Sequence, residues 1–524
     1  MHGFDATVSP AADNFSGPWY RAMNRYHWFV LAVAAMGWLF DTMDQQLFVL
    51  ARPAAMEDLL PIPAGADAKT ADGIRATRAT ASGNATTIFM TGWATGGLVF
   101  GVLGDRIGRA RTMIITILLY SLFTGLSSLS QGVWDFAFYR FLTGLGVGGE
   151  FAVGVALVAE VMPSVARPYA LALLQALSGI GNVTAALIFL GLGFAQEHGW
   201  IARALGSGAV AVPWRIMFLV GAIPAVVAIL IMRRLKEPEA WQRVSHDGTM
   251  TSQLGSYRSL FREPVLRSRA LFGLMLGFAG VVGLWSVGFY TFDLIRFVQR
   301  KPVTELVYRE QREVAERAGD RARKAQLETL TAEAGKASAA SSAALPPELK
   351  QLKTDLDASV SGRLARWSAY TSIAMNLGAA LGMFGFGALA QRIGRRPTFA
   401  LAFLAAFAST LAVFWFLQDF WQIWLMVPVM GFCQLSLFAG YAIYFPELFP
   451  TRLRSTGTSF CYNVGRFVAA AGPSALGLLR SRAFYGFGEP LDMRYAGMTM
   501  CTVFLLGLFA LPFLPETKGQ PLPE

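Results

Sequence analysis

The stretch Gly101-Val-Leu-Gly-Asp-Arg-Ile-Gly-Arg-Ala-Arg111 lies between two long apolar runs. It returns in the second half of the chain as Gly387-Ala-Leu-Ala-Gln-Arg-Ile-Gly-Arg-Arg-Pro397, again between two apolar runs. A basic, glycine-containing turn in matching places of two apolar regions indicates that the chain is built from two similar halves. Paired halves in an apolar chain are a common construction of secondary transporters.

The composition places most of the chain in lipid and argues against several other classes of protein. Hydrophobic residues make up 54% of the 524 residues and charged residues only 15%, whereas a soluble protein carries about 25% charge. The formal charge of +11 fits the basic cytoplasmic loops of a membrane protein, so we expect no nucleic-acid partner. No nucleotide loop, metal-ligand spacing or nucleophile triad occurs in the sequence. We therefore expect no enzyme activity, no cofactor and no metal site.

Apolar runs of about 20 residues predict an all-α membrane protein with twelve transmembrane helices in two pseudo-symmetric six-helix bundles. The spans are expected near 28–50, 85–103, 113–131, 134–159, 170–194 and 214–232, and then near 270–297, 367–390, 398–417, 421–445, 457–479 and 497–513. Residues 1–232 form the first bundle, 233–269 a polar, basic cytoplasmic linker, and 270–524 the second bundle. Residues 1–27 are polar and contain no apolar leader, so the first span should be retained.

The distribution of Lys and Arg predicts the orientation of the chain. Basic residues gather in alternate connections, which places both termini in the cytoplasm of a multi-pass protein of the cell (inner or plasma) membrane. Two outer segments are unusual. Residues 51–84 are read as a long Ala-rich loop. Residues 299–366 are an insertion with leucines at helical spacing, read as an external helical hairpin or tongue, either a solvated decoration or a partner or gating element.

The repeated turn has the pattern G-x-L-x-(D/Q)-R-x-G-R-x-(R/P), which resembles the loop between the second and third helices of the major facilitator superfamily. Other segments resemble its sugar-porter branch and organic-anion relatives, the metabolite:proton symporters of the sialic-acid and aromatic-acid type. They are Arg140 to Glu150, the turn 236–241, and the signatures 446–457 and 515–519. The likeness covers nearly the whole chain except 51–84 and 299–366. It implies two bundles that rock about a central cavity.

Two carboxylates in the first span are candidates for proton coupling. Asp41 and Asp44 share one helix face, and an ionised group in hydrocarbon is costly unless it is paired, faces a cavity or carries a proton. Arg140 in the fourth span lies at a similar depth, so an Asp–Arg pair is geometrically possible. Two readings stay open: a static structural pair, or a site that loads and releases a proton as the cavity alternates.

Arg466 in the eleventh span is the candidate contact for a substrate anion. It lies near the bilayer midplane, and its own span has no acid to neutralise it. A buried guanidinium needs a partner, and a substrate carboxylate fits its fork of donors. The alternative is a fixed internal pair. The run around it resembles the eleventh helix of carboxylate and sialic-acid proton symporters and organic anion transporters, where the corresponding arginine is a candidate anion contact.

Polar and aromatic residues at the same depth complete the predicted pocket. Each alone is more often a contact between helices than a ligand contact, but together they would suit a medium-sized polar or aromatic solute. They are Gln175, Asn182, Trp285, Tyr290, Asn376, Gln434, Tyr441, Tyr444, Tyr462 and Asn463.

Charges in the inner loops are the predicted gate. Asp105 can sit at the N-terminus of a neighbouring helix, where a carboxylate is favoured. The resemblance implies that charges from both halves hold the inner side closed: Asp105, Arg106, Arg109, Arg111, Glu160 and Arg167 in one half, and Arg392, Arg395, Arg396, Glu447 and Arg454 in the other. Gln391 stands where an acid is usual, so the second half of this lock should be weaker or differently wired.

These observations predict a secondary active transporter that carries a small organic anion, a carboxylate or sugar acid, together with protons. The expected partners are the solute, protons and the lipid bilayer, and the protein is expected to act as a monomer. A hexose substrate is doubtful, because the seventh span lacks the Gln-Gln pair of hexose carriers. Two alternatives stay open: a proton-independent uniporter or sugar/polyol carrier of the same fold, and a non-transporting membrane receptor that uses the insertion 299–366.

Overall fold

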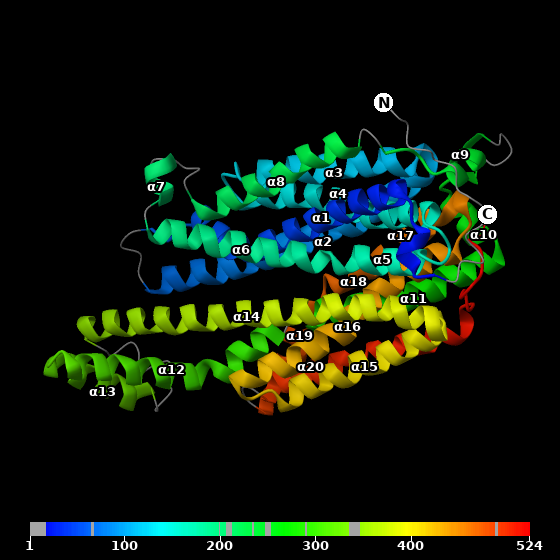
Figure 1. The fold of residues 1–524 in the computed structure, drawn as a ribbon. Helices are drawn as coiled ribbons and strands as arrows, with labels where there is room; N and C mark the ends of the chain where they lie inside the picture. Colours follow the sequence, from blue (N-terminus) through cyan, green and yellow to red (C-terminus); the bar gives the residue numbers. More distant parts are fainter. Residues whose placement is uncertain are drawn as a thin grey trace.

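Every regular element in the described part of the chain is a helix, and the helices form two bundles that lie side by side along a common axis (Figure 1). The computed structural model describes residues 17–63, 68–198, 200–205, 212–232, 235–246, 253–288, 291–334, 346–487 and 491–523. Within these residues, nine segments are long and apolar enough to cross a membrane, judged by length and composition. The prediction of an all-α membrane protein is confirmed.

The N-terminal bundle contains the first six predicted spans. They are α1 (Arg25–Leu59), α2 (Ala68–Ile107), α3 (Arg109–Ser127), α4 (Val133–Val161), α5 (Arg167–Ala176) with its continuation α6 (Ser178–Glu197), and α8 (Pro213–Met232), while α7 (Trp200–Leu205) is a short connection. The first helix starts at a capping box, in which the Asn24 side chain accepts from the backbone N–H of His27. Such a cap satisfies backbone donors that a helix start leaves free.

The C-terminal bundle repeats this plan with more interruptions. It consists of α11 (Pro264–Ser286) continued by α12 (Thr291–Arg317), α14 (Pro347–Ile393), α15 (Arg395–Phe416), α16 (Phe420–Leu448), the broken eleventh span α17 (Arg454–Asn463), α18 (Gly465–Ala469) and α19 (Gly472–Leu478), and the last span α20 (Leu491–Cys501) with α21 (Phe504–Ala510). The linker carries α9 (Glu239–His246) and α10 (Tyr257–Arg262). The seventh span begins at Pro264, earlier than expected, because proline suits the first helical position.

The expectation of a long Ala-rich loop over 51–84 is wrong. The first helix continues to Leu59 and the second begins at Ala68, so most of this segment extends the two helices beyond their apolar parts. Alanine has the highest intrinsic helix propensity. An Ala-rich stretch that directly adjoins two stable helices therefore prolongs them more readily than it forms a loop.

Glycines bring the corresponding helix pairs of the two bundles into close contact. A Cβ on Gly148 of α4 would overlap the backbone carbonyl of Trp93 on α2, and a Cβ on Gly382 of α14 would overlap that of Phe432 on α16. Small residues at such crossings let the backbones approach, as is usual in membranes. The matching pairs α2–α4 and α14–α16 express the internal symmetry that the repeated turn predicts.

The two bundles meet along two helix pairs related by the same symmetry. The second span, α2, packs against α17, and the fifth span, α5, packs against α14, with α6 continuing that contact. The repeated turns, the linker helices α9 and α10, and the C-terminal segment lie at one end of the molecule (Figure 1). We call this the charged end, defined by the turns 101–111 and 387–397.

The described residues of the insertion 299–366 are mainly helical and form a tongue at the opposite end (Figure 1). It consists of the outer part of α12, the separate helix α13 (Arg321–Ala334) and the first turns of α14. These helices share a small apolar core that is distinct from the main core and includes Val307, Leu327, Leu330 and Leu356. The tongue is therefore a small three-helix bundle with its own packing, carried on two membrane helices.

Candidate functional site

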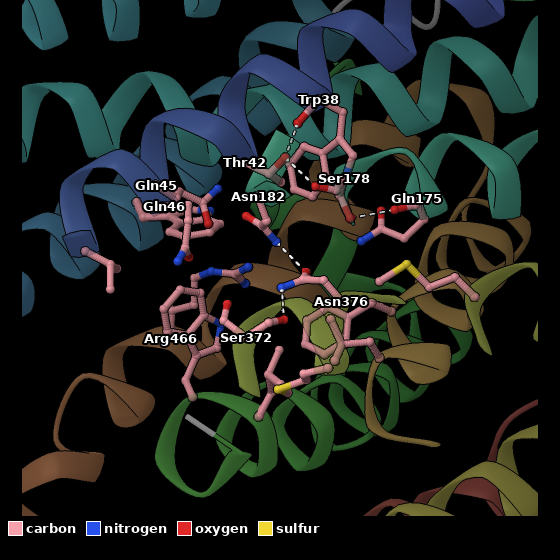
Figure 2. A pocket seen from close by; sticks show the side chains of 18 of the residues that line it. Trp38, Thr42, Gln45, Gln46, Gln175, Ser178, Asn182, Ser372, Asn376 and Arg466 are labelled. Atoms are coloured by element: carbon pink, nitrogen blue, oxygen red, sulfur yellow. Dashed lines mark hydrogen bonds between the residues drawn. The ribbon is translucent and has the colours of Figure 1, made fainter. Parts of the chain in front are cut away.

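A cavity with about 780 Å³ of empty space, part of it open to solvent, lies between the two bundles. Its walls come from seven of the twelve spans (Figure 2). The N-terminal half supplies Trp38, Thr42, Gln45, Gln46, Val49, Trp93, Gln175, Ser178 and Asn182, and the C-terminal half supplies Leu284, Trp285, Ser372, Met375, Asn376, Met383, Leu435, Phe438, Tyr462 and Arg466. Aromatic faces, amides and one guanidinium thus surround the same space.

Arg466 is the cation of this cavity. Its side chain is 1% exposed, and its Cζ lies 4.0 Å from the centroid of the Trp93 ring and 4.3 Å from that of the Tyr462 ring. Its Nη1 donates to the Tyr462 carbonyl at 2.9 Å, while its Nε has no partner. Among the described residues, no carboxylate lies within ion-pair distance of it. The guanidinium is held in place by two rings, but its charge is not neutralised.

Amide side chains cross the boundary between the halves inside the cavity. Asn182 of α6 donates to Oδ1 of Asn376 on α14 at 2.9 Å, and Nδ2 of Asn376 donates to the carbonyl of Ser372 (Figure 2). The Oε1 atom of Gln175 is buried and has no partner in the described part of the protein. The cavity wall thus contains an amide pair that joins the bundles, and the Gln175 Oε1 acceptor is available to a ligand.

One face of α1 lines the cavity, and the sequence analysis did not assign its residues. Trp38, Thr42, Gln45, Gln46 and Val49 are all lining residues. Their spacing of four, three, one and three residues follows one face of an α-helix. That periodicity was visible in the sequence, whereas Asp41 and Asp44, which the sequence analysis selected, do not line the cavity. Trp93 and Phe438 carried no comparable signal, because each is an ordinary residue of an apolar span.

Asp44 and Arg140 form the pair that the sequence analysis considered possible. Arg140 Nη1 lies 3.6 Å from Asp44 Oδ2, and both side chains are fully buried. Asp44 Oδ1 also accepts from the hydroxyl of Thr124 at 2.8 Å. Arg140 donates to the hydroxyls of Ser127 and Thr143. Both charges have several partners, and neither residue lines the cavity.

Asp41 lies one turn from Asp44 but in a different environment. It is fully buried; its Oδ2 accepts a long 3.4 Å hydrogen bond from Gln45, and its Oδ1 has no partner among the described residues. Glu150, Asp44 and Arg466 all interact with it electrostatically, the first two by repulsion and Arg466 by attraction. Asp41 does not line the cavity, but Gln45, which binds it, does. Of the two predicted carboxylates, Asp41 is therefore the one coupled to the cavity and its cation.

Several predicted pocket residues make other contacts. Gln434 donates to the hydroxyl of Thr410, and Tyr441 donates to the carbonyl of Leu276. Asn463 donates to the carbonyl of Gly148 and to Ser459. These three, with Tyr444, which donates to the Pro515 carbonyl, are not lining residues. The contacts hold helices together, which is the more common use of a polar side chain in a membrane bundle. Tyr290 lies outside the described residues.

At the charged end, Glu160 of α4 joins the two halves. Its Oε1 lies 2.9 Å from Arg109 Nη2 of α3 and 2.8 Å from Arg454 Nη1 of α17, and all three side chains are buried. Arg109 also reaches across to the carbonyl of Thr451 at 2.7 Å. One carboxylate thus compensates an arginine from each bundle, and the charged end is closed by this contact.

Asp105 makes a second link between the halves. Its carboxylate accepts from the backbone N–H groups of Ser455 and Thr456 at 3.1 and 2.8 Å, and from the Thr456 hydroxyl at 2.6 Å. These groups form the first turn of α17, where free N–H groups and the helix dipole favour an anion. The structure thus has Asp105 at the start of a neighbouring helix, as the sequence analysis expected. This helix belongs to the other half.

The second copy of the turn makes different contacts, as the replacement of an acid by Gln391 predicts. Gln391 accepts from Arg395 at 3.3 Å within its own half. Arg395 also pairs with Glu447 at 2.8 Å, again inside the C-terminal bundle. Arg106 donates to the Leu254 carbonyl of the linker. Arg392 is exposed, and its backbone carbonyl accepts from Lys518 Nζ at 2.7 Å.

Matching carboxylates cap the helices that follow the repeated turns. Glu237 accepts from the backbone N–H groups of Ala110 and Arg111, both at 3.1 Å. Glu516 accepts from those of Arg395 and Arg396 at 2.8 and 3.0 Å. Partial burial raises the pKa of Glu516, but these backbone donors outweigh it and hold the pKa below its ordinary value. The segments after the sixth and the last span therefore take the same place in each half.

Comparison with known proteins agrees with this architecture. The sequence model of the Major Facilitator Superfamily matches residues 28–301 and 337–524. The cis,cis-muconate transport protein of Acinetobacter baylyi is 26% identical, over 82% of this chain and 84% of its own length. The sialic acid transporter NanX of Escherichia coli is 23% identical, over 94% and 96%. The proton:xylose symporter XylE shares the fold, with a TM-score of 0.60 and 16% identity over 95% and 98% of the two chains.

Proposed function

Because this chain belongs to the major facilitator superfamily and is a multi-pass membrane transporter, we propose that it carries a small organic anion together with protons by alternating access. The observation that carries the proposal is the uncompensated guanidinium of Arg466 in the cavity between the bundles. A buried cation without a counter-charge is costly. A substrate carboxylate supplies that charge and accepts two hydrogen bonds in the plane of the fork.

The rest of the cavity supports an organic rather than an inorganic anion. The rings of Trp38, Trp93, Trp285 and Phe438 give it apolar walls, and amides give it a few fixed polar contacts, the usual composition of a small-molecule site. The named relatives transport cis,cis-muconate and sialic acid, which are organic acids. We therefore assign carboxylates and sugar acids as the substrate class.

Proton coupling follows from the carboxylates behind the cavity. While no substrate is bound, the positive charge of Arg466 acts on Asp41 and partly offsets the effects of burial and of the Glu150 and Asp44 carboxyls on that group. A substrate anion at Arg466 removes this effect, because it offsets the positive charge and adds a second negative one. Asp41 then gains affinity for a proton. Anion and proton enter together, and the loaded cavity contains fewer uncompensated charges than the empty one.

The contacts at the charged end supply the gate of this cycle. Glu160 and Asp105 hold the two bundles together there, so the cavity can open toward that side only after these bonds break. We assign the charged end to the cytoplasm of the cell membrane, with both termini on that side, because its turns carry the basic residues that cytoplasmic loops retain. The protein acts as a monomer, since each chain contains its own complete cavity.

The direct test is uptake into proteoliposomes. Radiolabelled carboxylates, sugar acids and sugars are offered at two external pH values, with and without a pH gradient. The proposal expects saturable uptake of at least one carboxylate that accumulates when the outside is acidic. Uptake that ignores the pH gradient would identify a uniporter, and uptake of neutral sugars alone would exclude the anion.

Replacing Asp41 with asparagine should separate exchange from accumulation. A one-proton symporter can accumulate its substrate about tenfold per unit of pH gradient. We expect Asp41→Asn to lose this accumulation and keep counterflow exchange of substrate, because an amide cannot release a proton. Asp41→Glu is the matched control, since it keeps a titratable carboxyl and should retain coupling. Accumulation by Asp41→Asn at the wild-type level would disprove the role of Asp41.

The tongue should be dispensable for transport. Its apolar core is separate from that of the bundles, so its removal need not disturb the cavity or the gate. We expect a variant in which residues 306–356 are replaced by a short Gly/Ser connection to keep wild-type uptake and coupling. Uptake assays in proteoliposomes test this, with Leu356→Asp as a point variant that disrupts the same core. Loss of transport in both would assign the tongue a part in the cycle.

A further inference from the structure

The carboxyl group of Glu150 lies deep in the N-terminal bundle, and neither of its oxygens has a hydrogen-bond partner in the described part of the chain. Glu150 is on α4, its side chain is 1% exposed, and both Oε1 and Oε2 are buried. A buried carboxylate that receives no hydrogen bond and no counter-charge costs several kcal/mol. At this position the neutral acid is therefore strongly favoured while no proton is being transferred.

The surrounding residues cannot neutralise it. Asp41 on α1 and Tyr120 on α3 interact electrostatically with Glu150. The cations of this region act on the two aspartates instead: Arg140 of α4 on Asp44, and Arg466 of the other half on Asp41. The helices α2, α5 and α16, which also pack against α4, bring charged side chains only near their ends. Of the two cations, Arg140 is occupied by Asp44. Apart from this pair, the described residues leave two carboxyls, Asp41 and Glu150, and one cation, Arg466, which faces the cavity.

Glu150 and Asp41 are close neighbours. A Cβ on Gly37, one helical turn before Asp41 on α1, would overlap Oε1 of Glu150, so the glycine provides the space in which the carboxyl lies. The Glu150 and Asp41 carboxyls repel one another electrostatically, and Asp41 is attracted by Arg466. Asp41 thus interacts with both Glu150 and Arg466, and its Oδ1 has no hydrogen-bond partner among the described residues.

Building on the proposed symport, we infer that Glu150 is a proton-carrying group of the transport cycle and that it exchanges its proton with the cavity side through Asp41. In this exchange, the carboxylic acid of Glu150 gives its proton to the Asp41 carboxylate. The products are a Glu150 carboxylate and an Asp41 carboxylic acid, and the net charge does not change. A substrate anion at Arg466 drives this step, because it raises the cost of a charged Asp41.

The test is the variant Glu150→Gln in proteoliposomes, compared with the wild type. The neutral amide imitates the protonated acid, so we expect counterflow exchange to persist while accumulation driven by a pH gradient falls at least tenfold. Infrared spectroscopy gives a second readout that a structural role would not produce. The wild type should show the carbonyl band of a buried protonated acid that does not exchange easily, and Glu150→Gln should lack it.

Two further variants keep the outcome decisive. Gly37→Ala displaces the Glu150 carboxyl without changing any charge. Like Glu150→Gln, it should reduce the accumulation driven by a pH gradient. Glu150→Asp keeps a carboxyl group and should retain part of the proton-driven accumulation. Wild-type coupling and an unchanged band in Glu150→Gln would overturn the inference and leave the proposed symport intact. Absence of proton-driven accumulation in the wild type would instead overturn the symport on which it rests.

Discussion

Replacing Arg466 with methionine is expected to abolish carboxylate uptake without destabilising the empty protein. Methionine keeps most of the side-chain volume but removes the charge and the fork. Hydrogen bonds to a charged group contribute about 1.5–3 kcal/mol, so affinity for the anion should fall roughly 10- to 150-fold. In the empty protein no carboxylate of the described residues lies within ion-pair distance of the guanidinium, and its Nε has no hydrogen-bond partner. Its removal should therefore leave the unfolding temperature unchanged or raise it.

This combination distinguishes the two readings of Arg466. Had the residue belonged to a fixed internal pair, its removal would strand a buried acid and cost about 3–5 kcal/mol of stability. Binding is measured by isothermal titration with a transported carboxylate, and stability by thermal unfolding in detergent. Arg466→Lys is the control: it keeps the charge, loses the planar fork and should bind weakly. Unchanged affinity in Arg466→Met would refute the assignment of Arg466 to the substrate.

Replacing Glu160 with glutamine is expected to open the charged end. The variant removes the carboxylate that links the buried Arg109 and Arg454; Arg109 keeps Asp105 at 3.1 Å, whereas Arg454 loses its ion pair. Loss of one member of a buried ionic contact costs about 3–5 kcal/mol, and only the closed state bears that cost. Opening lets both guanidinium groups reach water. A change of about 3 kcal/mol alters the ratio of the two states roughly 150-fold.

Distances between spin labels measure this shift. Cysteines placed at the exposed positions Arg111 and Arg392, one in each half, should report longer distances in Glu160→Gln; the partly exposed Cys433 is first replaced by serine. Glu447→Gln is the matched control, because Glu447 pairs with Arg395 inside one bundle. It should cost stability but leave the distance unchanged. Equal widening in both variants would show that general loosening, rather than the bond between the halves, is responsible.

The sequence predicted the parts of this fold that depend on local patterns. The apolar runs, the repeated turn and the basic connections gave two bundles of six spans, because each pattern acts within a few residues. The prediction of a loop over 51–84 was wrong, because composition alone does not distinguish a loop from a helix that continues beyond its apolar part. The breaks after Ala176 and Asn463 were also missed, since no proline marks them.

The candidate site could be predicted only in part, because a sequence gives depth along a helix but not the direction of a side chain. Asp44 and Arg140 were correctly matched by depth. Gln434 and Tyr441 lie at suitable depth but point toward other helices. The sequence shows Glu150 only as the end of a motif, and the lack of any hydrogen-bond partner for its carboxyl among the described residues becomes visible only once the helices around it are in place.

The continuous helix α14 has a practical consequence for following the transport cycle. It runs over 47 residues, about 70 Å at the rise of an α-helix, from the tongue through the cavity wall to the turn 387–397. A rigid rod of this length converts a few degrees of tilt near its middle into displacements of several ångströms at its tip. A fluorophore on the tongue would therefore register each rocking movement in real time, far from every residue that touches the solute.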